Sequence, residues 1–229
     1  MDIVSSLLVV VVTLGVLFLL YKYGSSMGIS SSSNQLLGPA VDGKKQFDSG
    51  VTLPNSINQP QGLTFSYATW IRIDDFSYRY GQEKVVFIRG PTDLSSMCPG
   101  VFLDGNTNSL LVKLDTYGAR EVIVVSNLTA KKWIHLAIAV DQDSIDVYIN
   151  GVLYTHRSIA QVPRQNPSSV HVGVGGGFDG KIASLNYYNY FLQPADVKSI
   201  MGNPPEPDKT EVSAPQPPYY DITWWTGRH

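Results

Sequence analysis

The sequence predicts an all-β protein, a two-sheet antiparallel sandwich, preceded by one transmembrane helix. Short alternating runs of apolar and polar residues begin near Phe47 and recur between turn residues, at the spacing of about 8–12 residues that is typical of a sandwich. Only 16% of the residues are charged, whereas Tyr, Val, Ser and Gly are plentiful, and this composition suits a β-rich protein. An uncharged apolar run near the N-terminus accounts for the helix.

The N-terminal run, IVSSLLVVVVTLGVLFLLY, extends from Ile3 to Tyr21. At about 1.5 Å per residue, a helix of this length crosses a hydrocarbon core of roughly 30 Å. A cleaved signal peptide would carry basic residues before a shorter apolar core, but the only charged side chain before this run is Asp2. We therefore predict that residues 1–23 are a retained single-pass anchor, which contacts membrane lipid through residues 3–21.

The charges beside the anchor favour a cytosolic sandwich. Lys22 follows the span and no Lys or Arg precedes it, so the positive-inside rule places the C-terminal side in the cytosol. The single cysteine, Cys98, allows no intramolecular disulfide, which agrees with a reducing compartment. Asn127 opens a glycosylation sequon, NLT, that matters only if the domain is lumenal. We predict a single-pass membrane protein with no glycan on Asn127.

Three segments follow the anchor. Residues 24–46 are rich in Ser and Gly and predict a flexible tether. Residues 47–202 carry the alternating runs of the sandwich, and residues 203–229 form a tail rich in Pro and aromatic residues that cannot join a central sheet. No second domain and no internal repeat is evident.

Eight stretches of the sandwich segment have the pattern of strands or of strand pairs. They are residues 63–73, 83–90, 100–105, 109–115, 121–127, 131–155, 169–175 and 181–191. A short helix is predicted after them in PADVKSIMG, where Pro194 lies near the first helical position and Gly202 ends the helix.

The stretch from Lys131 to Thr155 predicts a tight antiparallel meander. Its first strand is apolar on both faces, with Ile134, Leu136, Ile138 and Val140 on one face and Trp133, His135, Ala137 and Ala139 on the other. Asp141–Ser144 turns the chain, and Asn150-Gly151 is a strong signal for a type I′ hairpin. We expect this strand to be covered on both faces. We also expect five side chains to be buried between the sheets: Trp70, Trp133, Ile138, Val147 and Ile149.

Three ordered stretches resemble the LamG-like jelly-roll domains of the concanavalin A-like lectin/glucanase superfamily. WIHLAIAVD…IDVYINGVL resembles the family's central hairpin, and KQFDSGVTLPNS…LTFSYATWIRID resembles its opening strands. VHVGVGGGFDGKIASLNYYNYFLQPADVKSIMG resembles its closing strand and the helix after it. The resemblance covers about residues 47–202 and implies two curved antiparallel sheets packed face to face. It does not imply one function, because this fold hosts glycosidases, lectins and adhesion modules.

The glycosidase branch of the family is disfavoured by the distribution of carboxylates. Such enzymes need two carboxylates flanking the scissile bond, and their signature in this family is Glu-x-Asp-x-x-Glu. The chain contains four glutamates, none of them in that pattern: Glu83, Glu121, Glu206 and Glu211. We predict no catalytic residues and no enzyme activity, and glycoside hydrolysis is the least favoured function.

Other chemistry finds little support. Gly175–Gly180 matches G-x-G-x-x-G, but a strand rather than a helix is predicted next, so we expect a bend and no cofactor. Cys98 is interpreted as a buried or half-buried thiol, and His135 as a hydrogen-bonded core imidazole. The net charge of −2 argues against nucleic acid as a partner.

Calcium remains a minor alternative to the prediction of no metal. Many relatives bind Ca²⁺ at the rim of the sandwich, and the resemblance makes Asp48 and Asp179 the weak candidate ligands. Ala183-Ser184 stands where the family usually has an acidic pair, which weakens the case. Asp141-x-Asp143-x-x-Asp146 also looks metal-like, but the strand pattern points these side chains into solvent.

Two groups of aromatic residues could bind a partner. Phe76, Tyr78 and Tyr80 lie in a polar loop and could stack on a sugar or a protein. The tail contains Tyr219, Tyr220, Trp224 and Trp225 after a proline-rich stretch that favours an extended backbone. We expect these four to dock on a neighbouring molecule, with folding back onto the chain's own sandwich as the alternative.

Two classes of function follow from these features. We predict a non-catalytic, membrane-anchored structural or interaction protein whose sandwich and tail dock onto protein neighbours in a large membrane-associated assembly. A minor capsid or virion membrane component of a large DNA virus is one setting that fits. The alternative is a carbohydrate-binding, lectin-like module displayed on a membrane, because the residues do not separate a glycan from a protein partner.

Overall fold

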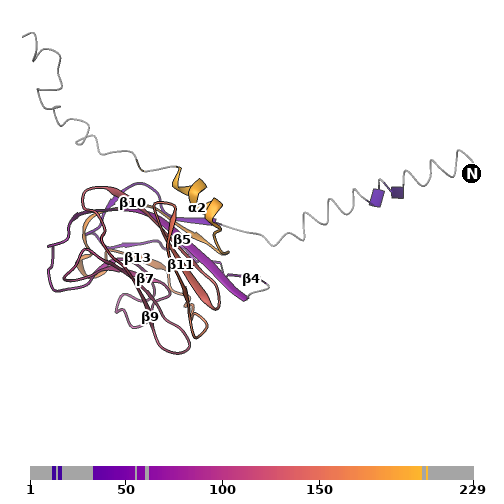
Figure 1. The fold of residues 1–229 in the computed structure, drawn as a ribbon, viewed down its shortest axis with the longest axis horizontal. Helices are drawn as coiled ribbons and strands as arrows, with labels where there is room; N and C mark the ends of the chain where they lie inside the picture. Colours follow the sequence, from indigo (N-terminus) through magenta and orange to yellow (C-terminus); the bar gives the residue numbers. More distant parts are fainter. Residues whose placement is uncertain are drawn as a thin grey trace, which may run out of the picture.

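The computed structural model describes residues 12–13, 15–16, 33–54, 56–59, 62–202 and 205, and shows two antiparallel sheets packed face to face (Figure 1). This agrees with the predicted all-β sandwich. The eight-stranded sheet contains, in spatial order, β1 (Ser33–Leu37), β14 (Asp179–Tyr188), β5 (Gly62–Asp75), β10 (Trp133–Val140), β11 (Ser144–Ile149) and β12 (Val152–Ser158). In addition, β2 (Val41–Asp42) pairs with β14, and β4 (Ile57–Gln59) pairs with β5.

The second sheet has six strands. Their spatial order is β3 (Phe47–Asp48), β13 (Val170–Val172), β6 (Lys84–Arg89), β7 (Gly100–Leu103), β8 (Leu110–Leu114) and β9 (Glu121–Val125). A 3-10 turn, η1 (Val174–Gly176), precedes β14, and helix α2 (Pro194–Met201) follows it. The glycine-rich segment at Gly175–Gly180 is therefore a bend that leads into a strand, as predicted.

The main core lies between the two sheets. Strand β10 contributes Ile134, Leu136, Ile138 and Val140 to it, and these side chains meet β6 residues such as Phe87 in one buried cluster. The other face of β10 carries Ala137 and Ala139, which pack with Val197 of α2 in a second cluster. The strand is thus covered on both faces, which confirms the prediction from its sequence.

Local sequence signals explain the turns and the helix. Asn150 and Gly151 both have positive φ angles, 50° and 76°, as a type I′ hairpin requires. In α2, Pro194 occupies the first turn, and the Asp196 carboxylate accepts the backbone N–H of Gln193 at 3.0 Å, which caps the helix. Figure 1 shows α2 beside β5 and β10, on the side of the sheet that faces away from the second sheet.

The structure corrects part of the tether prediction for residues 24–46. Residues 33–37 form β1, which pairs with β14, and residues 41–42 form β2. Leu36 and Leu37 are both 5% exposed. The Ser-rich composition hid this strand because an edge strand needs only one pairing partner and a short apolar segment.

Two of the five expected core residues lie on the other face of the sheet. Trp70 lies opposite His135, and Trp133 lies opposite Arg72, on the outer face of the eight-stranded sheet. The outer face is the one that points away from the six-stranded sheet. Trp70 is buried there and Trp133 is half-buried. The prediction that they lie between the sheets is wrong, because a large side chain signals burial without saying on which face. Ile138 and Val147 lie in the core as expected, and Ile149 is half-buried against it.

Two predicted features fall largely outside the described residues. Of the anchor, only Val12, Thr13, Gly15 and Val16 are described, and they are helical. Within the described part of the chain, no helix has the length and apolarity needed to cross a membrane. The four aromatic residues of the tail, Tyr219, Tyr220, Trp224 and Trp225, also lie outside the described residues.

A matched pair of leucine substitutions tests this arrangement. Leu136→Ala removes a side chain that is 1% exposed between the sheets and should lower the free energy of unfolding by about 2–5 kcal/mol. Leu153→Ala removes one that is 47% exposed on β12 and should change it by less than about 0.5 kcal/mol. Urea unfolding followed by tryptophan fluorescence measures both. Equal costs at the two sites would contradict the placement of β10 in the core.

Candidate functional site

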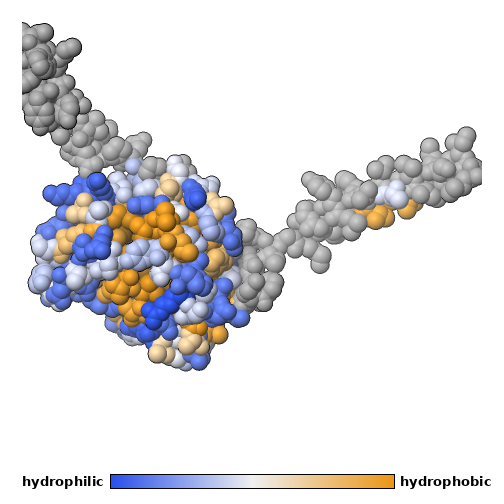
Figure 2. Space-filling model, viewed as in Figure 1, coloured by the Kyte–Doolittle hydropathy of each residue, from blue (hydrophilic) through white to orange (hydrophobic). Residues whose placement is uncertain are grey.

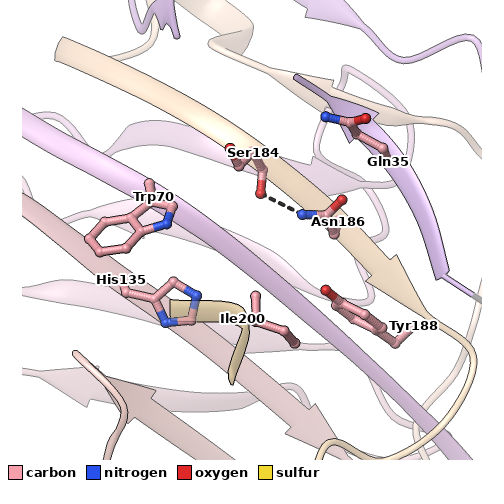
Figure 3. Close-up of a pocket in the computed structure, with 7 residues that line it drawn as sticks. All are labelled: Gln35, Trp70, His135, Ser184, Asn186, Tyr188 and Ile200. Carbon is pink, nitrogen blue, oxygen red and sulfur yellow. Dashed lines mark hydrogen bonds between the residues drawn. The ribbon is translucent and has the colours of Figure 1, made fainter. Parts of the chain in front are cut away.

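The outer face of the eight-stranded sheet carries a hollow of about 260 Å³ beside α2 (Figure 3). Seven residues line it: Gln35, Trp70, His135, Ser184, Asn186, Tyr188 and Ile200. They come from β1, β5, β10, β14 and α2. In Figure 3 the rings of Trp70 and His135 lie side by side across the hollow from Asn186 and Tyr188. We call this site the outer-face hollow.

The register of four strands brings these residues together. Trp70 on β5 lies opposite His135 on β10, and their rings meet nearly edge to face with centroids 5.1 Å apart. One step along the same face, Ala68 lies opposite Ala137, and α2 packs over this pair of small side chains. The helix covers the alanines and contributes only Ile200 to the lining of the outer-face hollow. The hollow therefore begins where the cover given by α2 ends.

His135 is a buried imidazole whose two ring nitrogens have no hydrogen-bond partner among the described residues. Burial lowers the pKa of His135 to about 4, so the ring is neutral near pH 7. A neutral imidazole offers one N–H donor and one acceptor. The predicted hydrogen-bonded core imidazole is thus wrong in one respect, because the hydrogen bonds of His135 are made by its backbone: its N–H donates to Asn150 Oδ1 at 2.9 Å, and its carbonyl oxygen accepts the Asn150 N–H at 2.8 Å. Leaving the two ring nitrogens of His135 unpaired in the interior costs free energy of folding. This cost favours a partner that enters the hollow.

The opposite wall supplies amide and hydroxyl groups. Gln35 on β1 lies opposite Asn186 on β14, just past a bulge at which Ser184 has a φ of 51°. Asn186 Nδ2 donates to the Ser184 carbonyl oxygen at 2.9 Å, which orients the amide. Burial raises the pKa of Tyr188 to about 12, so its hydroxyl stays protonated and able to donate. This wall offers both donors and acceptors without a formal charge.

The two aspartates predicted as weak calcium ligands make contacts with groups of the chain itself. Asp179 pairs with Lys44 Nζ at 2.9 Å, and Lys44 also lies 4.8 Å from the centre of the Tyr78 ring. Asp48 lies on β3, in the other sheet, and its carboxylate accepts the backbone N–H of Gly50 at 3.0 Å. Within the described residues, no three His, Cys, Asp or Glu side chains are grouped so that they could hold a metal. At Asp179 the positive charge is supplied by a lysine of the chain itself.

The aromatic loop contributes to a second hollow, of about 230 Å³. Phe76 and Tyr80 line it together with Ser77, Asn106, Thr107 and Asn108, and Tyr80 is 70% exposed. Lys84 fixes the start of the loop by donating to the Phe76 carbonyl oxygen at 3.1 Å. Tyr78 is not part of this lining, because its hydroxyl donates to the Gly176 carbonyl oxygen at 3.1 Å.

The structure also places Asp146 and Cys98, two residues that were interpreted from the sequence. Asp146 does not point into solvent as predicted; it is buried, and its carboxylate binds the Tyr148 hydroxyl at 3.1 Å and His156 Nδ1 at 2.6 Å. Cys98 is a buried thiol, as predicted, and burial raises its pKa to about 12. A thiol that remains protonated at neutral pH is a poor nucleophile.

Sequence reasoning missed the outer-face hollow as a unit. Its clearest signal is the apolar outer side of β10, on which His135 is the only side chain that can titrate. Trp70 and Asn186 join it only through the pairing of distant strands, which one sequence does not reveal. Gln35 was hidden in the predicted tether.

A family model described as the concanavalin A-like lectin/glucanases superfamily matches residues 42–198. A search of curated proteins gave no significant match. Among solved structures, the receptor binding domain of botulinum neurotoxin D is 12% identical, with 76% of this chain and 48% of that chain covered and a TM-score of 0.56. The binding domain of botulinum neurotoxin serotype G is 19% identical, with 77% and 47% covered and a TM-score of 0.53.

The binding domain of Paraclostridial Mosquitocidal Protein 1 is 18% identical, with 76% of this chain and 48% of that chain covered and a TM-score of 0.54. The chain therefore spans about half the length of the solved domains it matches. At these identities the likeness shows the fold alone.

The buried imidazole of His135 gives a testable pH dependence. Between pH 6.5 and about 4, the unfolded chain binds a proton at His135 that the folded chain does not. The contribution of His135 to the free energy of unfolding is therefore fully present above pH 6.5. It is lost as the pH falls toward 4, and the loss is on the order of 3 kcal/mol. Urea unfolding of wild type and His135→Gln across this window measures it. The variant should lose less stability on acidification, and an unchanged pH dependence would contradict the neutral buried ring.

Proposed function

The chain belongs to the concanavalin A-like lectin/glucanases superfamily, and we propose that it is a non-catalytic, membrane-anchored binding module that recognises a glycan in the outer-face hollow. The observation that carries this proposal is the unpaired, buried imidazole of His135 beside the Trp70 ring in that hollow. Buried polar groups are nearly always hydrogen-bonded in proteins. Because the ring is 0% exposed, a ligand rich in hydroxyl groups would complete these bonds only by displacing the side chains that cover it at the wall of the hollow.

The chemistry of the lining supports a sugar. Trp70 and Tyr188, each 8% exposed, border the hollow with aromatic side chains, whose exposed parts can contact the apolar face of a sugar ring. Asn186 and Gln35 carry amides, which can donate to one hydroxyl and accept from another. Small-ligand sites usually place a few polar groups among apolar and aromatic side chains, and this lining combines both kinds with a larger polar share.

The similar structures add a weaker argument. They are described as receptor binding or binding domains of two botulinum neurotoxins and of Paraclostridial Mosquitocidal Protein 1. Their sequence identity to this chain is 12–19%. What is shared is the fold. That this chain also binds a receptor is part of our proposal, and the outer-face hollow gives it a concrete location.

The proposal of a non-catalytic role has a chemical basis. Glycoside hydrolysis generally needs two carboxylates on either side of the bond to be broken. Among the residues that the structure describes, no aspartate or glutamate lines the outer-face hollow. A glycan held there would be bound and released unchanged.

A protein partner is the second candidate, and the edges of the sheets favour it. The exposed apolar side chains of the described residues include Val122 and Val124 on β9 and Val152, Leu153 and Tyr154 on β12. The two edges meet, since the Ser126 N–H donates to the Tyr154 hydroxyl at 3.0 Å and Arg157 Nη1 donates to the Val122 carbonyl oxygen at 3.0 Å. Figure 2 shows apolar areas interrupting the polar surface of the sandwich. Exposed apolar patches often mark protein contacts.

The proposed setting is a membrane surface. The apolar run at residues 3–21 supports a single-pass anchor, and Lys22 supports a cytosolic sandwich. The aromatic tail at residues 219–225 supports docking onto a neighbour in a membrane-associated assembly, of which a virion with an internal membrane is one example. These parts of the proposal rest on the sequence.

Glycan-array binding of the full chain in lipid nanodiscs tests the main proposal, because alkyl-glycoside detergents would compete for the site. Asn186→Ala should weaken binding of the best glycan about fivefold or more, since a lost hydrogen bond costs about 1 kcal/mol. Asn106→Ala in the second hollow is the matched control and should have no effect. If Asn106→Ala weakens binding and Asn186→Ala does not, the ligand occupies the aromatic loop instead.

The membrane topology has its own test. Deleting residues 3–21 should release the chain from membranes that retain the full chain after alkaline extraction. Asn127 is exposed, so a lumenal sandwich would present its sequon to the glycosylation machinery. In cells that glycosylate, we expect no change in mobility after glycosidase treatment. A shift that is absent in Asn127→Gln would place the sandwich on the other side of the membrane.

A further inference from the structure

We propose that the outer-face hollow accepts a single uncharged sugar unit at the end of a glycan and rejects units that carry a carboxylate or a sulfate. This inference rests on the proposed glycan binding and specifies its ligand class. It follows from three observations: the charge of the lining, the pairing of charged side chains in the next row of the sheet, and the size of the hollow.

The lining itself carries no charge. It consists of two amides, a hydroxymethyl group, three rings and an isoleucine, and both titratable groups among them stay neutral near pH 7. An anionic sugar would have to leave its water shell without gaining a cationic partner in the lining, since the exposed Lys198 of α2 is not part of it. Burial of an unpaired charge is strongly unfavourable, whereas hydroxyl groups can exchange water for amide and imidazole partners.

The next row of the sheet contains cations, but each faces an acid of the chain. Arg72 lies opposite both Trp133 and Lys181, one step along the same face from Trp70. Arg72 Nε binds Asp74 Oδ1 at 2.9 Å, and Lys181 lies opposite Asp42 of β2. This row is thus balanced in charge and offers no net attraction to an anion.

Two other lysines lie farther along the strand. Lys131 and Lys132 come just before β10 and are exposed. The nearer of the two, Lys132, is three residues before His135, so at about 3.3 Å per residue their Cα atoms lie about 10 Å apart along the chain. That distance exceeds the Debye length of about 8 Å at physiological salt. Their attraction for an anion in the hollow is therefore largely screened.

The size of the hollow suits one sugar unit. Its volume of about 260 Å³ lies just below the range of about 300–1,000 Å³ for pockets that hold drug-sized ligands. Ile200 of α2 borders it on one side and Gln35 of the edge strand β1 lies on another. A longer glycan would have to leave the hollow after its terminal unit.

The experiment compares matched glycans on the full chain in nanodiscs. Each pair consists of a neutral oligosaccharide and the same oligosaccharide with a terminal sialic acid or a sulfate on its end unit. We expect the neutral member to bind at least about tenfold more tightly, with little dependence on salt. Equal or tighter binding of the charged member would overturn the inference and leave the proposed glycan binding intact. If no glycan binds, the proposed function itself fails.

A charge introduced at the rim gives a second test. Ile200→Lys places a cation beside the outer-face hollow and should reduce or reverse the preference for the neutral glycan. Ser199→Lys puts the same charge on an exposed position of α2 that does not line the hollow, and should leave the preference unchanged. Gln35→Lys, on the exposed edge strand, repeats the test if Ile200→Lys lowers the melting temperature. An equal effect of Ser199→Lys would mean that the charge of the whole surface, rather than the hollow, sets the preference.

Discussion

The pairing register of β5 between β10 and β14 is the constraint on which the rest of the structure depends. Side chains alternate between the two faces of a strand, so a slip of one residue would exchange the faces. In the observed register Ile71 lies in the core between the sheets, opposite Ile134 and Ile182, whereas Trp70 lies outside, opposite His135 and Ala183. The same pairing that completes the core therefore also assembles the aromatic wall of the outer-face hollow.

An apolar outer face needs a cover, and the chain covers it only in part. Val197 of α2 packs over Ala68 and Ala137, where small side chains let the helix approach closely. Beside Trp70, which is 8% exposed, the cover ends at the outer-face hollow, and the fully buried His135 lies at the wall of that hollow. Filling this hollow with a larger apolar residue would gain packing energy, and the polar side chains that line it instead support the proposed binding site.

The sequence predicts what is encoded locally. The Asn150-Gly151 turn, the start of α2 at Pro194 and the alternation along β10 each depend on a few adjacent residues, and all three agree with the structure. The outer position of Trp70 and the strand at Ser33–Leu37 depend on pairing between distant segments, which a single sequence does not specify. The hollow belongs to the second kind, because its residues come from five elements.

Charged groups elsewhere in the fold show how the hollow differs. Asp179 is paired with Lys44, Arg72 with Asp74, and the buried Asp146 with Tyr148 and His156. Arg89 also buries its guanidinium in the core, where the Tyr187 ring lies 5.5 Å from it and stabilises the charge. At these places the chain supplies at least one partner from its own residues, although Nε and Nη1 of Arg89 have no hydrogen-bond partner among the described residues. At His135 it does not, and the unsatisfied ring borders a space of sugar-unit size, so the missing partner is best sought in a ligand.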